Sequence, residues 1–315
     1  MKITNKHGVP DVIWRAAQND KYSRGLADIS VTQLIDAPQI AVLRERHVEE
    51  LESDVVDRMW SLLGTAVHSL LEHASEGALV EERLFCKAGG LTISGAIDVQ
   101  EEEEDGSISI MDFKVTGAAS VQYGKDSWHN QLNCYAYLVR KNKGKPVKRL
   151  QICAILRDWK KSEMLRDSRY PKSPIILVEI PVWSDARQDG YIETRAQLHY
   201  AARQGDPVPC TQVDRWERNE RWAVLKTPKA KRALRNYQSE AEAIAAADGK
   251  YIVQHRPGTC VRCEQDFCGV AKWCQQWKEI QDDSGLFNTE HSSDPGLDQS
   301  QPNHKPKPDT DDLFF

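Results

Sequence analysis

Apolar residues recur along the chain with two different periods, and these predict strands and helices. In residues 93–100 (ISGAIDVQ) and 107–115 (SISIMDFKV), β-branched residues alternate or cluster, which is typical of strands. The stretch between them is acidic and ends in Asp-Gly, a strong hairpin signal. Further apolar runs predict strands at Leu79–Lys87, Leu150–Asp158 and Ile175–Trp183.

Apolar residues three and four positions apart predict helices in other segments. Residues 59–72 (MWSLLGTAVHSLLE) form an apolar helix within a longer helical segment, 53–75, and residues 128–137 (WHNQLNCYAY) form an aromatic-rich helix. Because the predicted strands are flanked by helices, the fold class is α/β, with a central mixed sheet covered on both faces. Further helices are predicted at Val31–Glu50, Ser184–Arg203, with Ser184 as its cap, and Tyr237–Ala247.

Length and charge suggest how the chain is divided. Its 315 residues can bury a sizeable core, and no apolar run approaches the roughly 18 residues that a membrane span requires. The net charge is −5, but residues 281–315 carry eight acids against two lysines, so residues 1–280 have a net charge of +1. We expect a core at residues 1–205, a basic and Cys-containing region packed on it at 206–280, and a disordered acidic tail at 281–315.

The predicted hairpin brings together residues suited to hydrolysis of a phosphodiester. Asp112 and Lys114 share one strand face, and Asp98 lies on the neighbouring strand. This reaction needs one or two divalent cations held by oxygen ligands, and a cationic group near the attacking water. Asp98, Asp112 and the carbonyl of Phe113 are candidate ligands for Mg²⁺ or Mn²⁺, and Lys114 is a candidate to orient or deprotonate water. The alternative is a surface hairpin with a solvated Asp and Lys.

Helices on either side of the hairpin add candidate residues. Gly64, His68 and Glu72 recur every four residues and share one helix face, where Gly64 would permit close backbone approach and His68 could bind Mn²⁺. Gln131 and Tyr135 share a face of the later helix and suit contact with a phosphate or a base. The alternative for each helix is that these residues only pack in the core.

Taken in order, these residues resemble the RecB-like branch of the PD-(D/E)XK nuclease superfamily, which includes CRISPR-associated-exonuclease-like members. That branch has four motifs: a G-x-x-x-H-x-x-x-E helix, a G-x-x-D strand, a D-Y/F-K strand and a Q-x-x-x-Y helix. The chain departs slightly where Val115, and not Thr, follows the Lys. The matching residues are, in motif order, Gly64, His68 and Glu72; Gly95 and Asp98; Asp112, Phe113 and Lys114; and Gln131 and Tyr135.

The resemblance implies a fold and a set of roles. It implies a PD-(D/E)XK (restriction-endonuclease-like) core in which Lys114 serves the nucleophile and Gln131 and Tyr135 lie at the DNA-facing edge. It extends over about residues 25–280 and is strongest over residues 60–138. The metal ligands that it implies are His68, Asp98 and Asp112, with the carbonyl of Phe113 and Glu72 as further candidates.

A second group of candidate ligands lies near the C-terminus, where residues 260–274 hold four cysteines. Residues 1–11 are polar and carry no secretory signal, so we expect a cytoplasmic, reducing setting in which such thiols bind a metal. The gaps of two, four and five residues lack the second C-x-x-C pair of common zinc sites, and iron–sulfur clusters tolerate uneven spacing. Zinc and an unmetallated segment stay open as alternatives. The four cysteines are Cys260, Cys263, Cys268 and Cys274.

The resemblance favours a 4Fe-4S cluster over structural Zn²⁺. In several RecB-like nucleases, three C-terminal cysteines and one distant N-terminal cysteine hold such a cluster. Here Ala37 stands where the distant cysteine would be expected. Cys263, Cys268 and Cys274 are therefore the expected ligands, with Cys210 or Cys260 as the fourth.

Basic residues gather at Arg218–Tyr237, interleaved with aromatic ones. Cations pair with phosphates and aromatic rings stack on bases, so this segment is a candidate DNA-binding surface. The alternative is a solvated charged helix. The candidate residues are Arg221, Trp222, Lys226, Lys229, Lys231, Arg232 and Arg235.

These observations predict a Mg²⁺- or Mn²⁺-dependent deoxyribonuclease that binds DNA and does not associate with a membrane. Exonuclease action at single-stranded or duplex ends is favoured, because the RecB-like branch mostly processes ends and the chain shows no base-reading module. The alternatives are a structure-selective endonuclease, a non-cutting DNA-binding accessory subunit and a replication adaptor. The segment Asp309–Phe315 (DTDDLFF) resembles acidic, aromatic-ended docking tails and is a candidate site for a replication or repair protein. The resemblance further implies a phage-encoded protein.

Overall fold

The structure, a computed structural model, describes residues 1–19, 25–74, 79–206 and 208–283, apart from the side chains of Glu72, His73, Leu79, Val80 and Asp283. Among these residues the chain forms two compact units. The first unit contains residues 1–36 and 47–206, and the second contains residues 37–46 and 208–283. Asp309–Phe315, the candidate docking segment, lies outside the described residues.

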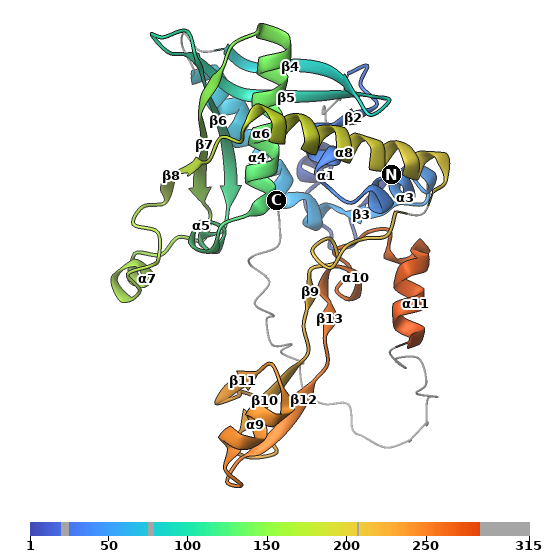
Figure 1. Cartoon of the computed structure of the whole chain (residues 1–315), viewed down its shortest axis with the longest axis vertical. Helices are drawn as coiled ribbons and strands as arrows, with labels where there is room; N and C mark the ends of the chain where they lie inside the picture. The colour runs from blue at the N-terminus through green and yellow to red at the C-terminus, as the bar shows by residue number, and fades with distance from the viewer. Residues whose placement is uncertain (20–24, 75–78, 207, 284–315) are drawn as a thin grey trace. The chain divides into compact units, whose positions relative to one another are not determined.

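A mixed sheet forms the centre of the first unit (Figure 1). Its strand order is β2-β5-β6-β7-β8, and β4 also pairs with β5. Strands β2 and β5 are parallel, as are β6 and β7, whereas the β4–β5, β5–β6 and β7–β8 pairs are antiparallel. The strands are β2 (Ile29–Ser30), β4 (Leu79–Ala88), β5 (Leu91–Glu102), β6 (Ile108–Thr116), β7 (Val147–Leu156) and β8 (Ile175–Ile180).

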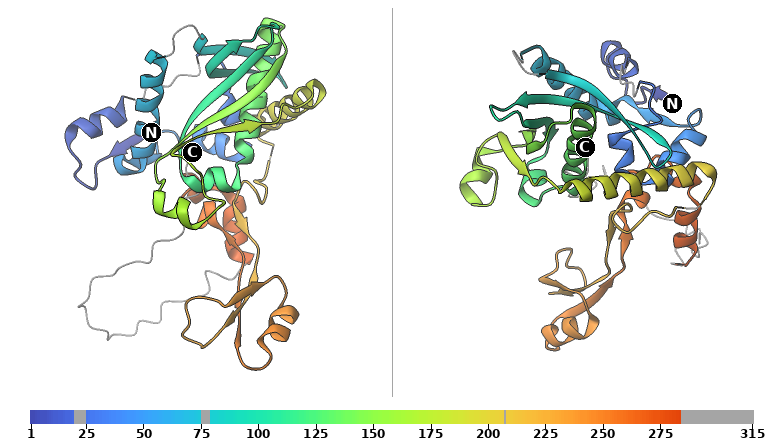
Figure 2. Two further views of the ribbon diagram at one scale, coloured as in Figure 1. Left: turned by 90° about the vertical axis from the view of Figure 1, so that its left-hand side faces the viewer. Right: turned by 45° about the horizontal axis from the view of Figure 1, so that its top comes forward.

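Helices lie on both faces of this sheet, which confirms the predicted α/β class. Helix α6 (Asp126–Lys143) contacts β4 through β8 and also contacts the long helix α8 (Asp185–Gln204), as Figure 2 shows. Helix α4 (Met59–Ala74) contacts β6 and carries His68 to the ring of Phe113, at 6.3 Å between ring centroids. Because Phe113 and Asp112 are consecutive in a strand, they face opposite sides, and Asp112 faces α6.

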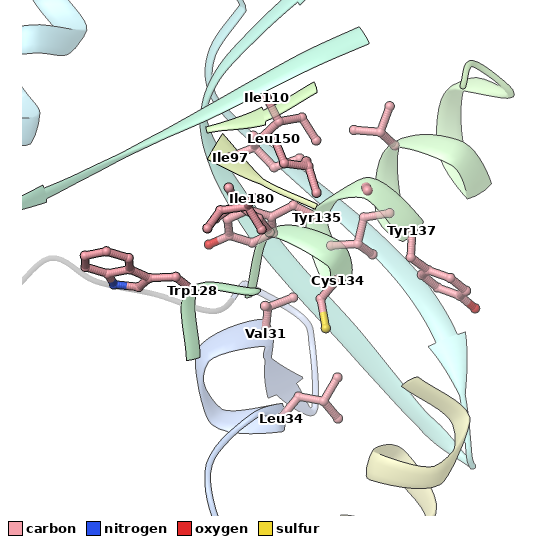
Figure 3. Packing of buried hydrophobic residues seen from close by; sticks show 14 of the residues in the cluster. Val31, Leu34, Ile97, Ile110, Trp128, Cys134, Tyr135, Tyr137, Leu150 and Ile180 are labelled. Atoms are coloured by element: carbon pink, nitrogen blue, oxygen red, sulfur yellow. The ribbon is translucent and has the colours of Figure 1, made fainter. Parts of the chain in front are cut away.

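Apolar side chains from α6 and the sheet form the main core (Figure 3). Ile97, Ile110 and Leu150 come from β5, β6 and β7, and Tyr135 and Cys134 come from α6. A close approach is required at one glycine of β5. A Cβ atom on Gly95 would lie 2.7 Å from Leu138 Cδ1 and 2.8 Å from Tyr135 Cε1, so only glycine lets α6 pack there.

Three predicted helices are shorter than the sequence pattern indicates. The one predicted at Tyr237–Ala247 begins only at Glu240, because Tyr237 is a strand residue. The segment Val31–Glu50 breaks at Ile35–Ala37, because Pro38 disfavours helical backbone in the residue before it. The predicted helix at 53–75 begins with two strand residues and a 3-10 turn, where the side chain of Asp54 caps the turn. The cap of α8 by Ser184 is confirmed, because its hydroxyl accepts from the N–H of Arg187.

The remaining elements of the first unit are short. Strands β1 and β3 form a parallel pair next to α1. Helix α5 follows β6, and α7 lies in the connection from β7 to β8. Their bounds are β1 (Lys2–Thr4), α1 (Asp11–Gln18), α2 (Val31–Leu34), β3 (Glu52–Asp54), η1 (Val55–Arg58), α5 (Ala118–Tyr123) and α7 (Lys161–Arg166).

The second unit contains a small sheet with strand order β11-β10-β12, against which α9 packs. A separate antiparallel pair, β9–β13, leads into the cysteine-containing segment. The segment 218–237 therefore contains the end of β9 and two further strands joined by a loop, and it is not the charged helix considered from its sequence. The bounds are α3 (Pro38–Arg46), β9 (Glu217–Arg218), β10 (Arg221–Leu225), β11 (Arg235–Tyr237), α9 (Glu240–Ala247), β12 (Ile252–Arg256), β13 (Thr259–Cys260), α10 (Val261–Glu264), η2 (Ala271–Trp273) and α11 (Gln275–Asp283).

Across the residues that the structure describes, no helix combines the length and the apolar character needed to cross a membrane.

Candidate active site and cysteine pocket

The candidate catalytic residues lie where strands β5 and β6 separate. The two strands pair from Glu102 with Ile108 to Val99 with Met111. Asp98 and Asp112 occupy the next position on each strand, beyond the last pair. From there β6 continues alongside β7, and β5 continues alongside β4. The predicted hairpin is present, but its acids stand at this fork between β5 and β6 and not on a continuous ladder.

Asp98 replaces a strand partner at the fork. Its Oδ2 atom accepts the backbone N–H of Phe113 over 2.8 Å. His68 reaches the same place from α4, with Nδ1 3.4 Å from Asp98 Oδ2 and Nε2 2.9 Å from the carbonyl oxygen of Phe113. The structure thus gathers Asp98, His68 and the Phe113 carbonyl around one position.

Asp112 is buried beside Lys114. Its Oδ2 atom lies 2.7 Å from Lys114 Nζ, and the Asp112 residue is 1% exposed. The Nε2–H group of Gln131 donates to Asp112 Oδ1 over 3.3 Å and to the Tyr135 hydroxyl over 2.8 Å. Gln131 and Tyr135 are themselves buried, so they support Asp112 from beneath and do not form the DNA-facing edge that the resemblance implied.

Burial and neighbouring charges shift the pKa values of these groups. Burial raises the pKa of Asp112 to about 6, Lys114 opposes this rise and Asp98 adds to it. The hydrogen bond to Asp98 raises the pKa of His68, although burial opposes it. Burial alone would lower the pKa of Lys114, but Asp112 and Asp98 outweigh burial and raise it. At the fork, therefore, the carboxyl groups of Asp98 and Asp112 lie close together, and nearby positive charge stabilises their ionised forms.

The donors at the fork fit a hard divalent cation. Carboxylate and carbonyl oxygens with one imidazole are suitable ligands for Mg²⁺ or Mn²⁺. Asp112 Oδ2 is enclosed and its close neighbour is Lys114 Nζ at 2.7 Å, so a bound cation would share this oxygen with the ammonium group. Among the residues that the structure describes, no three His, Cys, Asp or Glu side chains stand in a metal-holding arrangement. The carboxylates of Asp98 and Asp112 would therefore have to turn toward a common ion.

In the first predicted motif, Gly64 contributes less than expected. A Cβ atom on Gly64 would meet nothing within 4 Å, so this glycine does not serve a close backbone approach. The helix is turned so that Gly64 faces open space. Glu72 lies on α4, but its side chain is outside the described residues.

Four cysteines line one small pocket within the second unit. They are joined there by Ile40 and Leu43 of α3, and the pocket encloses about 10 Å³. Cys210 is held by Gln276, whose Oε1 accepts the Cys210 N–H over 2.8 Å and whose Nε2 donates to the Cys210 carbonyl over 2.9 Å. The four cysteines are Cys210, Cys263, Cys268 and Cys274.

Cys260 does not line this pocket. Its thiol is hydrogen-bonded to Arg215, and its backbone N–H donates to Glu264. Burial raises the pKa values of Cys210 and Cys263 to about 12. Asp214 and then the neighbouring thiols add to the rise at Cys210, and neighbouring thiols add to it at Cys263. Thiolates are suitable ligands for a structural metal centre, which would stabilise their ionised form. Like the residues of the fork, these four thiols do not stand in a metal-holding arrangement, so they would have to rearrange around a metal.

The predicted DNA-binding residues lie on β10, β11 and the loop between them. Arg221, Lys226, Lys229, Lys231, Arg232 and Arg235 are all exposed. Trp222 differs from these cations, because its ring lies 4.9 Å from that of His255 and it packs on the small core formed by Val224, Ala243 and Ala247. Its place is therefore partly structural. The residues belong to the second unit, whereas the fork belongs to the first.

Sequence reasoning did not identify Arg157, which follows β7 directly. Its backbone N–H donates to the carbonyl of Thr116 at the end of β6, over 3.0 Å. The sequence did contain a signal for Arg157, because it is a cation within the predicted strand Leu150–Asp158, and such a strand can pair with the strand that carries the catalytic residues. The parallel pairing of β6 with β7 was not predictable, and it decides this position.

One comparison, with protein-family models, agrees with the superfamily that the motifs indicate. The model of the PD-(D/E)XK nuclease superfamily matches residues 23–275. No curated protein matches the chain. Among solved structures, the chain is similar to one described as "Crystal structure of SSO0001", at 15% identity and a TM-score of 0.45, over 65% of this chain and 90% of that chain.

Proposed function

The chain belongs to the PD-(D/E)XK nuclease superfamily, and from this premise we propose that it is a Mg²⁺- or Mn²⁺-dependent deoxyribonuclease of the RecB-like branch. It hydrolyses phosphodiester bonds as an exonuclease at single-stranded or duplex DNA ends, in phage replication, recombination or repair. The observation that supports this most directly is the meeting of Asp98, Asp112, Lys114 and His68 at the fork.

The residues of the fork divide the chemistry between them. Asp98, Asp112, His68 and the Phe113 carbonyl would hold the cation, which when bound supplies positive charge against the phosphate and acidifies the attacking water. Lys114 keeps its proton on Nζ beside Asp112 and orients that water. Gln131 holds Asp112 in place through its hydrogen bond to Oδ1.

The cysteine pocket serves the enzyme structurally in this proposal. Cys210, Cys263, Cys268 and Cys274 hold a metal centre that orders the second unit, and Cys210 is the fourth ligand because Cys260 lies outside the pocket. The resemblance favours a 4Fe-4S cluster. Zn²⁺ is the second candidate. The pocket encloses only about 10 Å³, and a single ion would require less movement of the thiols than a four-iron cluster would.

A comparison of linear and circular substrates tests the proposed activity. End-labelled single strands, end-labelled duplexes and covalently closed circles are incubated with Mg²⁺, Mn²⁺ or Ca²⁺. An exonuclease degrades the linear DNAs in Mg²⁺ or Mn²⁺ and leaves the circles intact, whereas a structure-selective endonuclease also opens circles that contain a loop. Binding without cleavage in every metal would instead indicate the accessory subunit, and the proposal would fail.

The replication adaptor predicts a different dependence on the acidic tail. A chain that ends at Ile280 keeps cleaving purified DNA if the fork is the active centre. It loses its effect on DNA if the tail, including Asp309–Phe315, is the functional part.

A further inference from the structure

Helix α4 exposes apolar side chains beside the fork. The helix is rich in apolar residues, yet none of its side chains that the structure describes is buried. Trp60 is 44% exposed, and Met59, Leu63 and Leu70 are also exposed. Single exposed apolar side chains are ordinary, but several on one helix indicate a candidate binding surface.

Arg157 lies against one end of this apolar surface. Its guanidinium carbon is 4.4 Å from the centroid of the Trp60 ring. Its Nη1 atom is enclosed by protein, and within the described residues it has no hydrogen-bond partner. A guanidinium presents donors in a planar fork that matches the oxygens of a phosphate. The Trp60–Arg157 pair therefore combines an exposed aromatic ring with a half-buried cation whose enclosed Nη1 donor would have to turn outward to meet a phosphate.

The distance of this pair from the fork follows from two elements. On α4, Trp60 precedes His68 by eight residues, which corresponds to about 12 Å along the helix. On β6, Thr116, which binds the backbone of Arg157, follows Phe113 by three residues, or about 10 Å. One nucleotide of a stacked strand advances about 3.4 Å, so the separation corresponds to about three nucleotides.

We propose that Trp60 and Arg157 bind a single DNA strand about three nucleotides from the scissile phosphate. A base stacks on the ring face of Trp60 that Arg157 does not cover, and Arg157 donates to a backbone phosphate. This inference rests on the proposed function and specifies its substrate as single-stranded DNA, because a base inside a duplex is stacked between its neighbours and cannot lie on a side chain.

The test measures binding separately from cleavage. The affinity for a fluorescent 12-nucleotide single strand is measured by anisotropy in Ca²⁺, which suppresses cutting. Trp60→Ala and Arg157→Gln are each expected to weaken binding by about tenfold, the usual effect of losing one stacked base. Arg157→Gln is further expected to lower the salt dependence of log Kd by about one phosphate contact.

The chain offers a matched control. Arg187 lies 4.1 Å from the ring centroid of Trp183, which reproduces the same chemistry on the β8–α8 connection. Trp183→Ala and Arg187→Gln are expected to change the affinity by less than about twofold, since neither lies on α4 or at the end of β6. Equal losses at both pairs, or no loss from Trp60→Ala and Arg157→Gln, would overturn the proposal.

A second set of variants separates base stacking from a structural role of Trp60. Trp60→Phe keeps an aromatic face and is expected to retain most of the binding, whereas Trp60→Leu keeps bulk only and is expected to bind like Trp60→Ala. If Phe and Leu bind alike while both variants are folded, stacking is excluded. A change in self-association by sedimentation velocity, with DNA binding unchanged, would make the surface a protein-docking site and refute the inference.

Steady-state cleavage distinguishes this inference from the proposed function. In Mg²⁺, Trp60→Ala is expected to raise KM for single strands by about tenfold and to leave kcat within about threefold. A wild-type protein that binds the strand but never cleaves it would refute the proposed function and leave the Trp60–Arg157 site standing. A wild-type protein that cleaves with the same kcat/KM as Trp60→Ala would refute the site alone.

Discussion

Oδ2 of Asp112 lies 2.7 Å from Nζ of Lys114, at the point where strands β5 and β6 separate. The two residues share one face of β6, and Asp112 is buried. A buried carboxylate needs a counter-charge, and here that charge comes from Lys114 together with any cation bound at the fork.

Asp112→Asn and Lys114→Met are each expected to lower the rate of DNA cleavage by at least about 100-fold. The first removes a proposed metal ligand, and the second removes the group proposed to orient water. Each single variant also leaves one partner unpaired, which destabilises the fold by about 3–5 kcal/mol, whereas the double variant recovers part of that loss. Initial cleavage rates and urea unfolding measure both effects.

Lys143→Met is the control for that experiment, because Lys143 Nζ forms its ion pair with Glu82 and not with a residue of the fork. It should cleave at close to the wild-type rate. Undiminished cleavage by Asp112→Asn or Lys114→Met, with both variants folded, would remove the fork from the catalytic role.

Gly95→Ala is expected to destabilise the first unit by about 1–3 kcal/mol, because its Cβ would overlap Leu138 and Tyr135. The displaced Tyr135 is hydrogen-bonded to Gln131, which also holds Asp112, so cleavage should slow as well. Thermal unfolding and cleavage rates give the two readouts.

Gly64→Ala provides the matched comparison, since a Cβ there meets nothing within 4 Å. Alanine in a helix interior should raise the unfolding free energy by about 0.5–1 kcal/mol and leave cleavage unchanged. If both substitutions have the same effect, the packing explanation for Gly95 is wrong.

Cys210→Ser is expected to lower the bound metal strongly, whereas Cys260→Ser should retain it. Cys210 lines the pocket with the other three thiols, and Cys260 is engaged by Arg215. Iron, zinc and acid-labile sulfide are assayed in anaerobically purified protein, together with visible absorbance. Iron with sulfide indicates the cluster, and stoichiometric zinc in a colourless sample indicates the single ion. Equal metal content in the two variants would exclude Cys210 as the distinguishing ligand.

His199 on α8 makes stability depend on pH. Burial, aided by Arg195, lowers its pKa to about 4, and its Nε2 lies 3.1 Å from the carbonyl oxygen of Leu34. The folded chain therefore favours the neutral imidazole, and the unfolded chain binds more protons between about pH 4 and 6.5. The stabilisation is complete above about pH 6.5 and is lost as the pH falls toward 4, by up to about 3 kcal/mol.

His199→Gln should flatten this part of the stability curve relative to the wild type. Urea unfolding at pH 4.5, 5.5 and 7 measures the difference. An identical slope in both proteins would show that another group governs acid unfolding.

Local patterns predicted the elements of the core well. The strands at 79–87, 93–100 and 107–115, the Asp-Gly hairpin and the Ser184 cap depend on neighbours within a few residues, and all of them are present. The break before Pro38 was also readable from the sequence, because proline restricts the residue before it, but the apolar periodicity obscured it.

The candidate site was only partly predictable. The residue types at the fork followed from the D-F-K strand, but the separation of β5 from β6, the burial of Gln131 and Tyr135 and the packing of Trp222 depend on partners far along the chain. The choice between Cys210 and Cys260 required the pocket, because spacing alone treats both as available thiols.

By itself, the sequence determined the α/β class, the order of the motifs and the identity of the acids and thiols, because these follow from local periodicity and residue chemistry. The tertiary structure alone decided which of them meet. Strand pairing, the orientation of α4 on the sheet and the assembly of the second unit all depend on contacts between distant positions. The second unit, for example, joins residues 37–46 with residues 208–283, and short-range patterns do not encode contacts at such separations.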